Sequence, residues 1–90
     1  MTAEELHTDG NAIAGLLEEL FGADMTDVDR TCQSCRRHFA VGEHRLYESA
    51  GHVLRCPRCG DLAACIAVLP GRSVVRLFGA WSMPRHAWAA

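Results

Sequence analysis

The clearest pattern of apolar and polar positions predicts an amphipathic helix over residues 11–21. Its apolar side chains recur at the i, i+3, i+4, i+7 spacing of one helix face: Ile13, Leu16, Leu17 and Leu20. Asp9 or Asn11 is placed to cap this helix, and Gly22 is placed to end it. Because a helix of this length is marginal alone, we expect its stripe to be buried, either on the chain's own strands or on a second copy or partner protein.

The other apolar segments predict antiparallel strands. Residues 44–48 and 52–55 flank a turn at residues 49–51 and predict a hairpin. The continuous apolar run at residues 62–69 predicts a strand buried on both faces, and residues 73–78 return as its partner. We expect these last two strands to supply most of the core.

The connecting and terminal segments carry weaker patterns. Residues 1–10 predict a frayed arm or a single turn, and the acidic connector after the helix holds Met25 and Val28, which continue the apolar seam. Trp81 is expected to cover the edge of the core. Trp88 is either an exposed side chain without a role or an anchor for a partner. The chain thus divides into an acidic N-terminal segment, a cysteine-containing segment and a C-terminal tail, at residues 1–30, 31–80 and 81–90.

Four cysteines in two pairs carry the strongest chemical signal. Cys32 and Cys35 form one C-x2-C motif, Cys56 and Cys59 form another, and 20 residues separate the two. Two residues between cysteines allow a tight turn to direct both sulfurs at one ion, and this spacing is typical of tetrahedral thiolate sites. We therefore predict a four-cysteine metal site. Zinc is the expected ion, and iron is the alternative because four thiolates accept either.

Length and composition are consistent with a small domain that depends on such a site. A 90-residue chain buries a modest fraction of its surface and often needs an additional cross-link, such as a bound metal ion, to be stable. The chain opens without a basic start or a long apolar run, so we expect no signal peptide and a reducing, cytoplasmic location. The longest apolar run, residues 62–69, is too short to span a bilayer, and no membrane partner is expected.

Cys65 is expected to be a small buried side chain, with a substitute ligand or redox partner as the alternative.

Charge is divided unevenly along the chain. The net charge is −2, but residues 1–29 hold eight of the 11 acidic side chains and no basic one. Residues 30–90 hold all nine basic side chains, every one an arginine, for a formal charge of +6. A divalent ion held by four thiolates would lower this value by about two, so the C-terminal part is only mildly basic.

At the two cysteine turns the chain resembles the zinc-ribbon superfamily. The string Cys-Pro-Arg-Cys-Gly at residues 56–60 matches the ribbon knuckle, and the resemblance covers residues 31–80. It implies a small α+β metal-stapled domain in which two cysteine knuckles and antiparallel β-hairpins are joined to one N-terminal α-helix. Arg36 stands where ribbons commonly have glycine, so we expect the first knuckle to be less regular than the second.

Two further resemblances bear on function. The same cysteines resemble those of rubredoxin, which implies iron and single-electron transfer. Over its whole length the chain, with the string Asp-Gly-Asn-Ala at residues 9–12 before its helix, resembles a family of small bacterial proteins of unknown function. Relatives in that family are expected to be encoded near flavin- or molybdenum-dependent oxidoreductases.

These observations favour a non-enzymatic binding module with structural zinc. Four protein ligands leave no coordination position for water, and the chain has no recognisable catalytic triad, phosphate loop or carboxylate pair, so no small-molecule substrate is expected. A protein partner or self-association is favoured. The candidate contact residues are Ile13, Leu16, Leu17, Leu20, Arg36, Arg37 and Arg58. An iron electron carrier is the first alternative. A nucleic-acid-binding ribbon is the second, although the acidic N-terminal segment and the absence of lysine argue against it.

Overall fold

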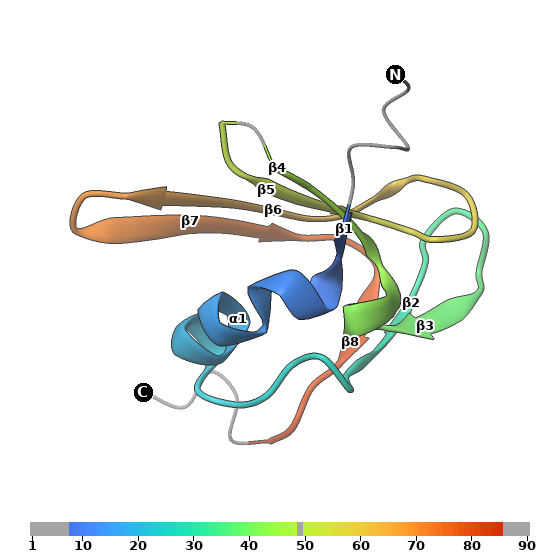
Figure 1. Cartoon of the computed structure of the whole chain (residues 1–90). Coiled ribbons are helices and arrows are strands. Elements are labelled where there is room, and N and C mark those ends of the chain that lie inside the picture. The colour runs from blue at the N-terminus through green and yellow to red at the C-terminus, as the bar shows by residue number, and fades with distance from the viewer. Residues whose placement is uncertain (1–7, 49, 86–90) are drawn as a thin grey trace.

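The computed structural model describes residues 8–48 and 50–85, which form a small α+β fold built from two antiparallel sheets (Figure 1). The larger sheet has the strand order β1-β4-β5-β6-β7, with bounds Thr8–Asp9, Arg45–Glu48, His52–Arg55, Leu62–Leu69 and Arg72–Leu77. The smaller sheet has the order β3-β2-β8, with bounds His38–Ala40, Asp29–Thr31 and Ala80–Ser82. Within the described residues there is one α-helix, α1, at Ala14–Phe21. The predicted α+β class with antiparallel hairpins is therefore confirmed.

The predicted N-terminal helix is present, but its first turn is tighter than expected. A 3₁₀ turn, η2, covers Gly10–Ile13, and α1 continues the helix to Phe21. The Asp9 carboxylate accepts a hydrogen bond from the Asn11 backbone N–H at 3.1 Å, as expected of an N-cap. Gly22 ends the helix with φ +74°, a conformation that glycine adopts without penalty. Across residues 8–48 and 50–85, no helix is both long enough and apolar enough to cross a membrane.

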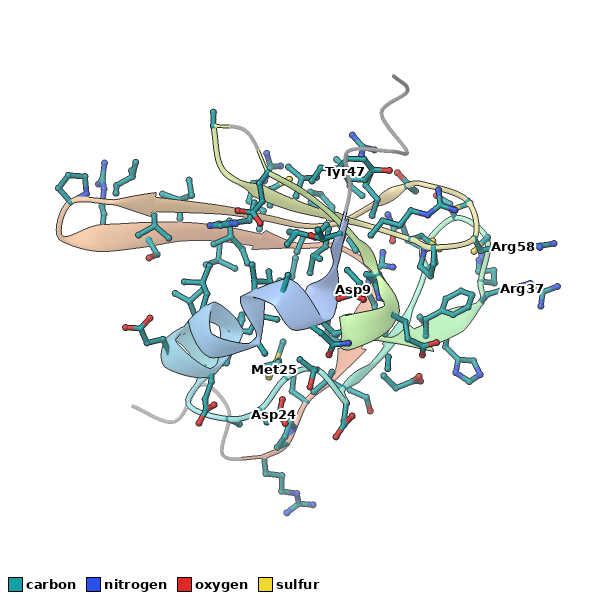
Figure 2. All side chains as sticks on the ribbon, viewed as in Figure 1. Asp9, Asp24, Met25, Arg37, Tyr47 and Arg58 are labelled. Atoms are coloured by element: carbon teal, nitrogen blue, oxygen red, sulfur yellow. The ribbon has the colours of Figure 1, made fainter. Side chains whose placement is uncertain are left out.

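The helix packs on the larger sheet, and this contact forms the centre of the core. The buried apolar cluster consists of Ile13, Leu17, Phe21, Met25, Val28, Val41, Leu46, Leu54, Ala63, Ala64 and Ile66. Leu16 and Leu20 are partly buried against its edge. Figure 2 labels Met25 beneath α1, where it extends the apolar seam as predicted. The helix stripe is thus covered by the chain's own strands.

The expectation that β6 and β7 supply most of the core is wrong. The fully buried residues of β6 end at Ile66, and Val68, Leu69 and Val74 are 57%, 41% and 46% exposed. Length explains the difference: an eight-residue strand spans about 27 Å, whereas the eight residues of α1 span about 12 Å. The β6–β7 hairpin therefore extends past the helix that covers its base (Figure 1).

The smaller sheet has no counterpart in the sequence pattern. β2 pairs with β3 on one side and with β8 on the other, with Arg30 opposite both Phe39 and Trp81. Residues 81 and 82, expected in the C-terminal tail, therefore lie in a strand, and Trp81 packs against the core as predicted. Three-residue strands carry too little alternation to be recognised. Trp88 lies outside the described residues.

β1 ties the start of the helix to the larger sheet. A frayed arm or a single turn was expected over residues 1–10, of which residues 1–7 lie outside the described part of the chain. Thr8 and Asp9 pair with Leu46 and Arg45 of β4. The following residue, Gly10, donates its backbone N–H to the His44 carbonyl at 2.9 Å. A Cβ at Gly10 would fall on the carbonyl oxygen of Val41, so only glycine permits this approach.

Truncating the helix at its most buried position should destabilise the whole domain. Leu17 is 0% exposed, so Leu17→Ala is expected to lower the free energy of unfolding by about 2–5 kcal/mol. Chemical denaturation of the metal-loaded protein measures this change. Leu69→Ala, at an exposed position of β6, is the matched control and should change stability by less than about 0.5 kcal/mol. Equal effects at the two positions would show that the helix does not anchor the core.

Candidate metal centre

The first cysteine turn connects β2 to β3 and is closed by backbone hydrogen bonds. The Arg36 N–H donates to the Cys32 carbonyl at 3.1 Å, and the Cys32 N–H donates to the Arg37 carbonyl at 2.8 Å. The Ser34 N–H points at the Cys32 sulfur at 3.4 Å. Such N–H groups offset negative charge on a thiolate, so this turn is built to carry one.

The second cysteine turn connects β5 to β6 and repeats the same pattern. The Gly60 N–H donates to the Cys56 carbonyl at 3.0 Å, and the Cys56 N–H donates to the Asp61 carbonyl at 2.8 Å. The Arg58 N–H points at the Cys56 sulfur at 3.4 Å. Each turn is thus the loop of a β-hairpin, one in each sheet, and the two turns present their sulfurs in the same way.

The first turn is as regular as the second, contrary to expectation. Arg36 has φ +66° and Gly60, at the equivalent position, has φ +82°. Arginine therefore adopts the left-handed conformation that glycine adopts freely, at a cost of about 1–2 kcal/mol. Among the described residues Arg36 is the one non-glycine residue with positive φ, which indicates that the hydrogen bonds of the turn override its preference.

The four sulfur atoms of Cys32, Cys35, Cys56 and Cys59 lie within 4.8 Å of one another. The Cys32–Cys59 and Cys35–Cys56 sulfur pairs are 3.6 and 3.7 Å apart, and each pair joins one turn to the other. With metal–sulfur bonds of about 2.3 Å, a tetrahedral ion separates its thiolates by about 3.8 Å. The sulfurs are too far apart for disulfides, and the arrangement fits a tetrahedral thiolate-bound ion. The predicted metal ligands are brought together.

The thiols influence one another's protonation. Burial raises the pKa of Cys32, but hydrogen bonds from the Cys35 and Ser34 backbone and from neighbouring thiols outweigh it and lower the pKa to about 6. At Cys59 the backbone hydrogen bond from Asp61 lowers the pKa, but partial loss of hydration and hydrogen bonds with the other three sulfurs raise it to about 11. The two thiols therefore differ in acidity, and a bound cation would displace the protons that the cluster retains.

A polar bridge ties the two turns together beside the sulfurs. Gln33, in the first turn, donates its amide to the Asp61 carboxylate at 3.0 Å and to the Leu62 carbonyl at 2.9 Å. The Ser34 hydroxyl donates to the same carboxylate. The Ser34 hydrogen bond, followed by the Leu62 backbone N–H, lowers the pKa of Asp61. This bridge uses no sulfur atom, so the turns are positioned by the protein itself.

Arg30 is a buried arginine that joins the two sheets next to this bridge. Its guanidinium, on a side chain only 1% exposed, donates to four acceptors. The acceptors and distances are the Phe78 carbonyl at 2.9 Å, His44 Nε2 at 3.1 Å, Gln33 Oε1 at 2.6 Å and the Leu62 carbonyl at 3.0 Å. The sequence analysis missed this role, because an arginine before a cysteine turn looks like a surface residue.

His44 completes the buried network as a neutral side chain. It is 0% exposed, its Nδ1 donates to the Ala40 carbonyl at 3.0 Å, and its Nε2 accepts from Arg30. Burial lowers the pKa of His44, and the positive charge of Arg30 lowers it further against the opposing Ala40 hydrogen bond. His44 directly follows η3, at Val41–Glu43, and its two ring nitrogens link Ala40, the last residue of β3, to Arg30 of β2.

The other predicted site residues separate into two groups. Arg36, Arg37 and Arg58 are exposed on the two cysteine turns, and Figure 2 shows Arg37 and Arg58 pointing outward at that end of the molecule. The helix residues lie elsewhere: Ile13 and Leu17 are inside the core, and Leu16 and Leu20 lie at its edge. Cys65 is half-buried on β6 and does not belong to the sulfur cluster.

Removing the Arg30 guanidinium should destabilise the junction between the sheets. Arg30→Met keeps most of the side-chain volume but leaves buried carbonyls and Gln33 without their donor, so we expect a loss of about 3 kcal/mol or more. Arg37→Met, at an exposed position, should stay within about 0.5 kcal/mol of the wild type. Denaturant unfolding of both variants measures the difference, and an unchanged Arg30→Met midpoint would contradict a structural role for the network.

The buried neutral His44 should make stability depend on pH. Its folded pKa lies below the unfolded value of about 6.5, so the unfolded chain binds the proton first and stability falls as the pH drops below about 6.5. The slope approaches about 1.4 kcal/mol per pH unit. The measurement is the difference in this slope between wild type and His44→Gln, with the exposed His38→Gln as control. A slope that survives in His44→Gln and equals that of the control would assign the pH dependence elsewhere.

Comparison with known proteins identifies the family and not the activity. No curated protein and no solved structure matches the chain. A family described as of unknown function, DUF6510, matches residues 3–87, which agrees with the whole-chain resemblance found in the sequence. With a match over nearly its entire length, the chain belongs to the DUF6510 family.

Proposed function

We propose that the protein is a non-enzymatic binding module of zinc-ribbon type, held together by one structural Zn²⁺. The observation that supports this most directly is the sulfur cluster, in which four thiolates lie within 4.8 Å of one another. Four thiolates fill the coordination sphere of a tetrahedral ion and leave no position for water or substrate. Zinc would then supply folding free energy and no catalytic group.

In this proposal the module works in the cytoplasm by contacting another protein or a second copy of itself. The exposed arginines on the cysteine turns, Arg36, Arg37 and Arg58, offer one such contact surface. They would also suit nucleic acid, but the net charge of −2 argues against a polyanionic partner. The helix stripe contributes less than expected, since Ile13 and Leu17 are already buried.

An iron-bound electron carrier of rubredoxin type is the second candidate. Cys59 is exposed while Cys32 and Cys56 are buried, so one ligand of a bound ion would lie at the surface. An exposed thiolate is a short route for an electron to a docked oxidoreductase, such as a flavin- or molybdenum-dependent enzyme. The ligand set alone accepts iron as well as zinc.

Metal analysis together with a visible spectrum separates the two candidates. Protein isolated without added metal should contain about one zinc per chain and be colourless, because Zn²⁺ has a filled d shell. Iron with a red colour that bleaches on reduction would replace the first candidate with the second. Neither metal in the isolated protein, with cooperative unfolding unaffected by a chelator, would contradict both.

Cysteine variants test whether the metal folds the chain. Cys56→Ala should abolish metal binding and cooperative unfolding together, since losing one buried ligand opens the cluster. Cys65→Ser is the matched control and should keep the stoichiometric metal, because Cys65 lies outside the cluster. A metal-free Cys56→Ala that still unfolds cooperatively would contradict a structural metal, and loss of metal in Cys65→Ser would make Cys65 a ligand.

A further inference from the structure

The larger sheet has a second face, which we call the open face. α1 packs on the face that carries Leu46, Leu54 and Ile66. Because side chains alternate between the two faces of a strand, the residues between these point the other way. Figure 2 shows Tyr47 on the side of the sheet away from α1, and no described helix lies on that side (Figure 1).

The centre of the open face is apolar. Strand register places Val53 beside Cys65, and Ala67 beside Val74. These four residues line a groove of about 230 Å³, whose other lining residues are Ala50, Gly51, His52, Ile66 and Arg76. Pockets for small molecules usually measure about 300–1,000 Å³, so this groove is better suited to one or two apolar side chains of a docked segment.

Arginines surround this apolar centre. The register places Arg45 and Arg55 at the end of the face nearer the cysteine turns, and Arg72 and Arg76 along β7. No carboxylate among residues 8–48 and 50–85 lies within 4.0 Å of an arginine nitrogen. The one acidic residue that these strands place on this face, Asp9, caps the helix. The face therefore presents cations that the described part of the chain does not neutralise.

A second copy of the chain does not satisfy this surface. Two copies related by a two-fold axis would bring the same face together, so the arginines would repel one another. The exposed acids of α1, Glu18 and Glu19, could meet the arginines only in a head-to-tail arrangement, which leaves a free surface at each end and propagates into rings or filaments.

Nucleic acid also fits this face less well. Single strands are held by bases stacked on exposed aromatic rings. Here the Arg55 guanidinium lies over the Tyr47 ring, 6.0 Å from its centroid, and Arg76 lies over Phe78 at 5.5 Å. Both rings already carry a guanidinium, and neither ring lines the groove.

We propose that the open face docks an acidic segment of a different protein, with apolar side chains in the groove and carboxylates on the surrounding arginines. Alternating acidic and apolar residues in an extended segment match both features, since arginine binds carboxylates through paired hydrogen bonds. This inference rests on the proposed function, because it names the class of partner that the binding module recognises.

The test is fluorescence anisotropy of the full, metal-loaded chain with a labelled peptide that alternates glutamate with leucine and valine. The peptide should bind, and its affinity should fall as salt is raised. A peptide with lysine in place of glutamate, one with serine in place of the apolar residues, and a single-stranded oligothymidylate should bind at least about tenfold more weakly.

Variants locate the binding surface. Arg76→Glu and Arg72→Glu should each weaken peptide binding by about tenfold or more, whereas Arg85→Glu, at an exposed position outside the larger sheet, makes the same charge change and should have little effect. Arg72 lies at the exposed end of the hairpin, so that variant remains informative if Arg76→Glu fails to fold.

Three results would overturn the proposal: peptide binding no tighter than that of the lysine peptide, binding that is insensitive to Arg72→Glu, or preferential binding of the oligothymidylate. Sedimentation that reveals a self-associated state lost in Arg72→Glu would assign the face to a second copy and would also overturn it. Metal content and cooperative unfolding are recorded on the same samples. Failure to bind the peptide with both intact contradicts this docking surface alone, whereas absence of metal contradicts the proposed function.

Discussion

The fold depends on bringing two cysteine turns, 20 residues apart in sequence, to one point in space. Each turn closes a hairpin of a different sheet, β2–β3 or β5–β6, and the β4–β5 hairpin carries the chain between them. The sulfurs can converge only if the two sheets hold a fixed relative position. In a domain this small the apolar core alone supplies limited stability, so the junction of the sheets needs interactions of its own.

Arg30 and Asp61 provide those interactions, and they do so at a cost. A buried guanidinium is expensive to desolvate, and Arg30 has no carboxylate within 4.0 Å among the described residues. Carbonyl groups, Gln33 and the neutral His44 accept its hydrogen bonds without cancelling its charge. A divalent ion with four thiolates carries a net charge of about −2. In the proposed zinc-bound state this negative charge lies at the cysteine turn that directly follows β2, the strand of Arg30. Metal binding would then favour burial of the Arg30 charge, and the buried arginine would favour metal binding.

The features predicted from the sequence are those with long or repeated patterns. The i, i+3, i+4, i+7 stripe gave the helix, and the apolar run gave β6 with its observed bounds, Leu62–Leu69. The repeated C-x2-C motif gave the sulfur cluster, because backbone geometry within each motif is local. The three-residue strands β2, β3 and β8 are too short to show a period, and they form through pairing between distant segments.

Arg30, His44 and Arg36 could not be assigned from residue type, since their roles depend on neighbours that only the fold supplies. Arginine is usually exposed, histidine is on average intermediate in burial, and a positive φ is usually left to glycine. Each of these residues departs from the general preference at the point where the two sheets or the two turns meet. Local preference is overridden there because many hydrogen bonds converge on one residue.

The mismatch in length between α1 and the β6–β7 hairpin links the core to the proposed binding surface. A longer helix would bury Val68 and Val75 more fully and would leave the hairpin less extended. The short helix instead stabilises only the half of the sheet that supports the cysteine turns. The other half remains a paired but largely uncovered ribbon, and the β7 edge strand carries Arg72 in this half and Arg76 nearer the core. Charged residues on an edge strand oppose aggregation through the free edge. The same arginines leave the face open to an acidic partner, so protection of the edge and selection of the partner follow from one set of side chains.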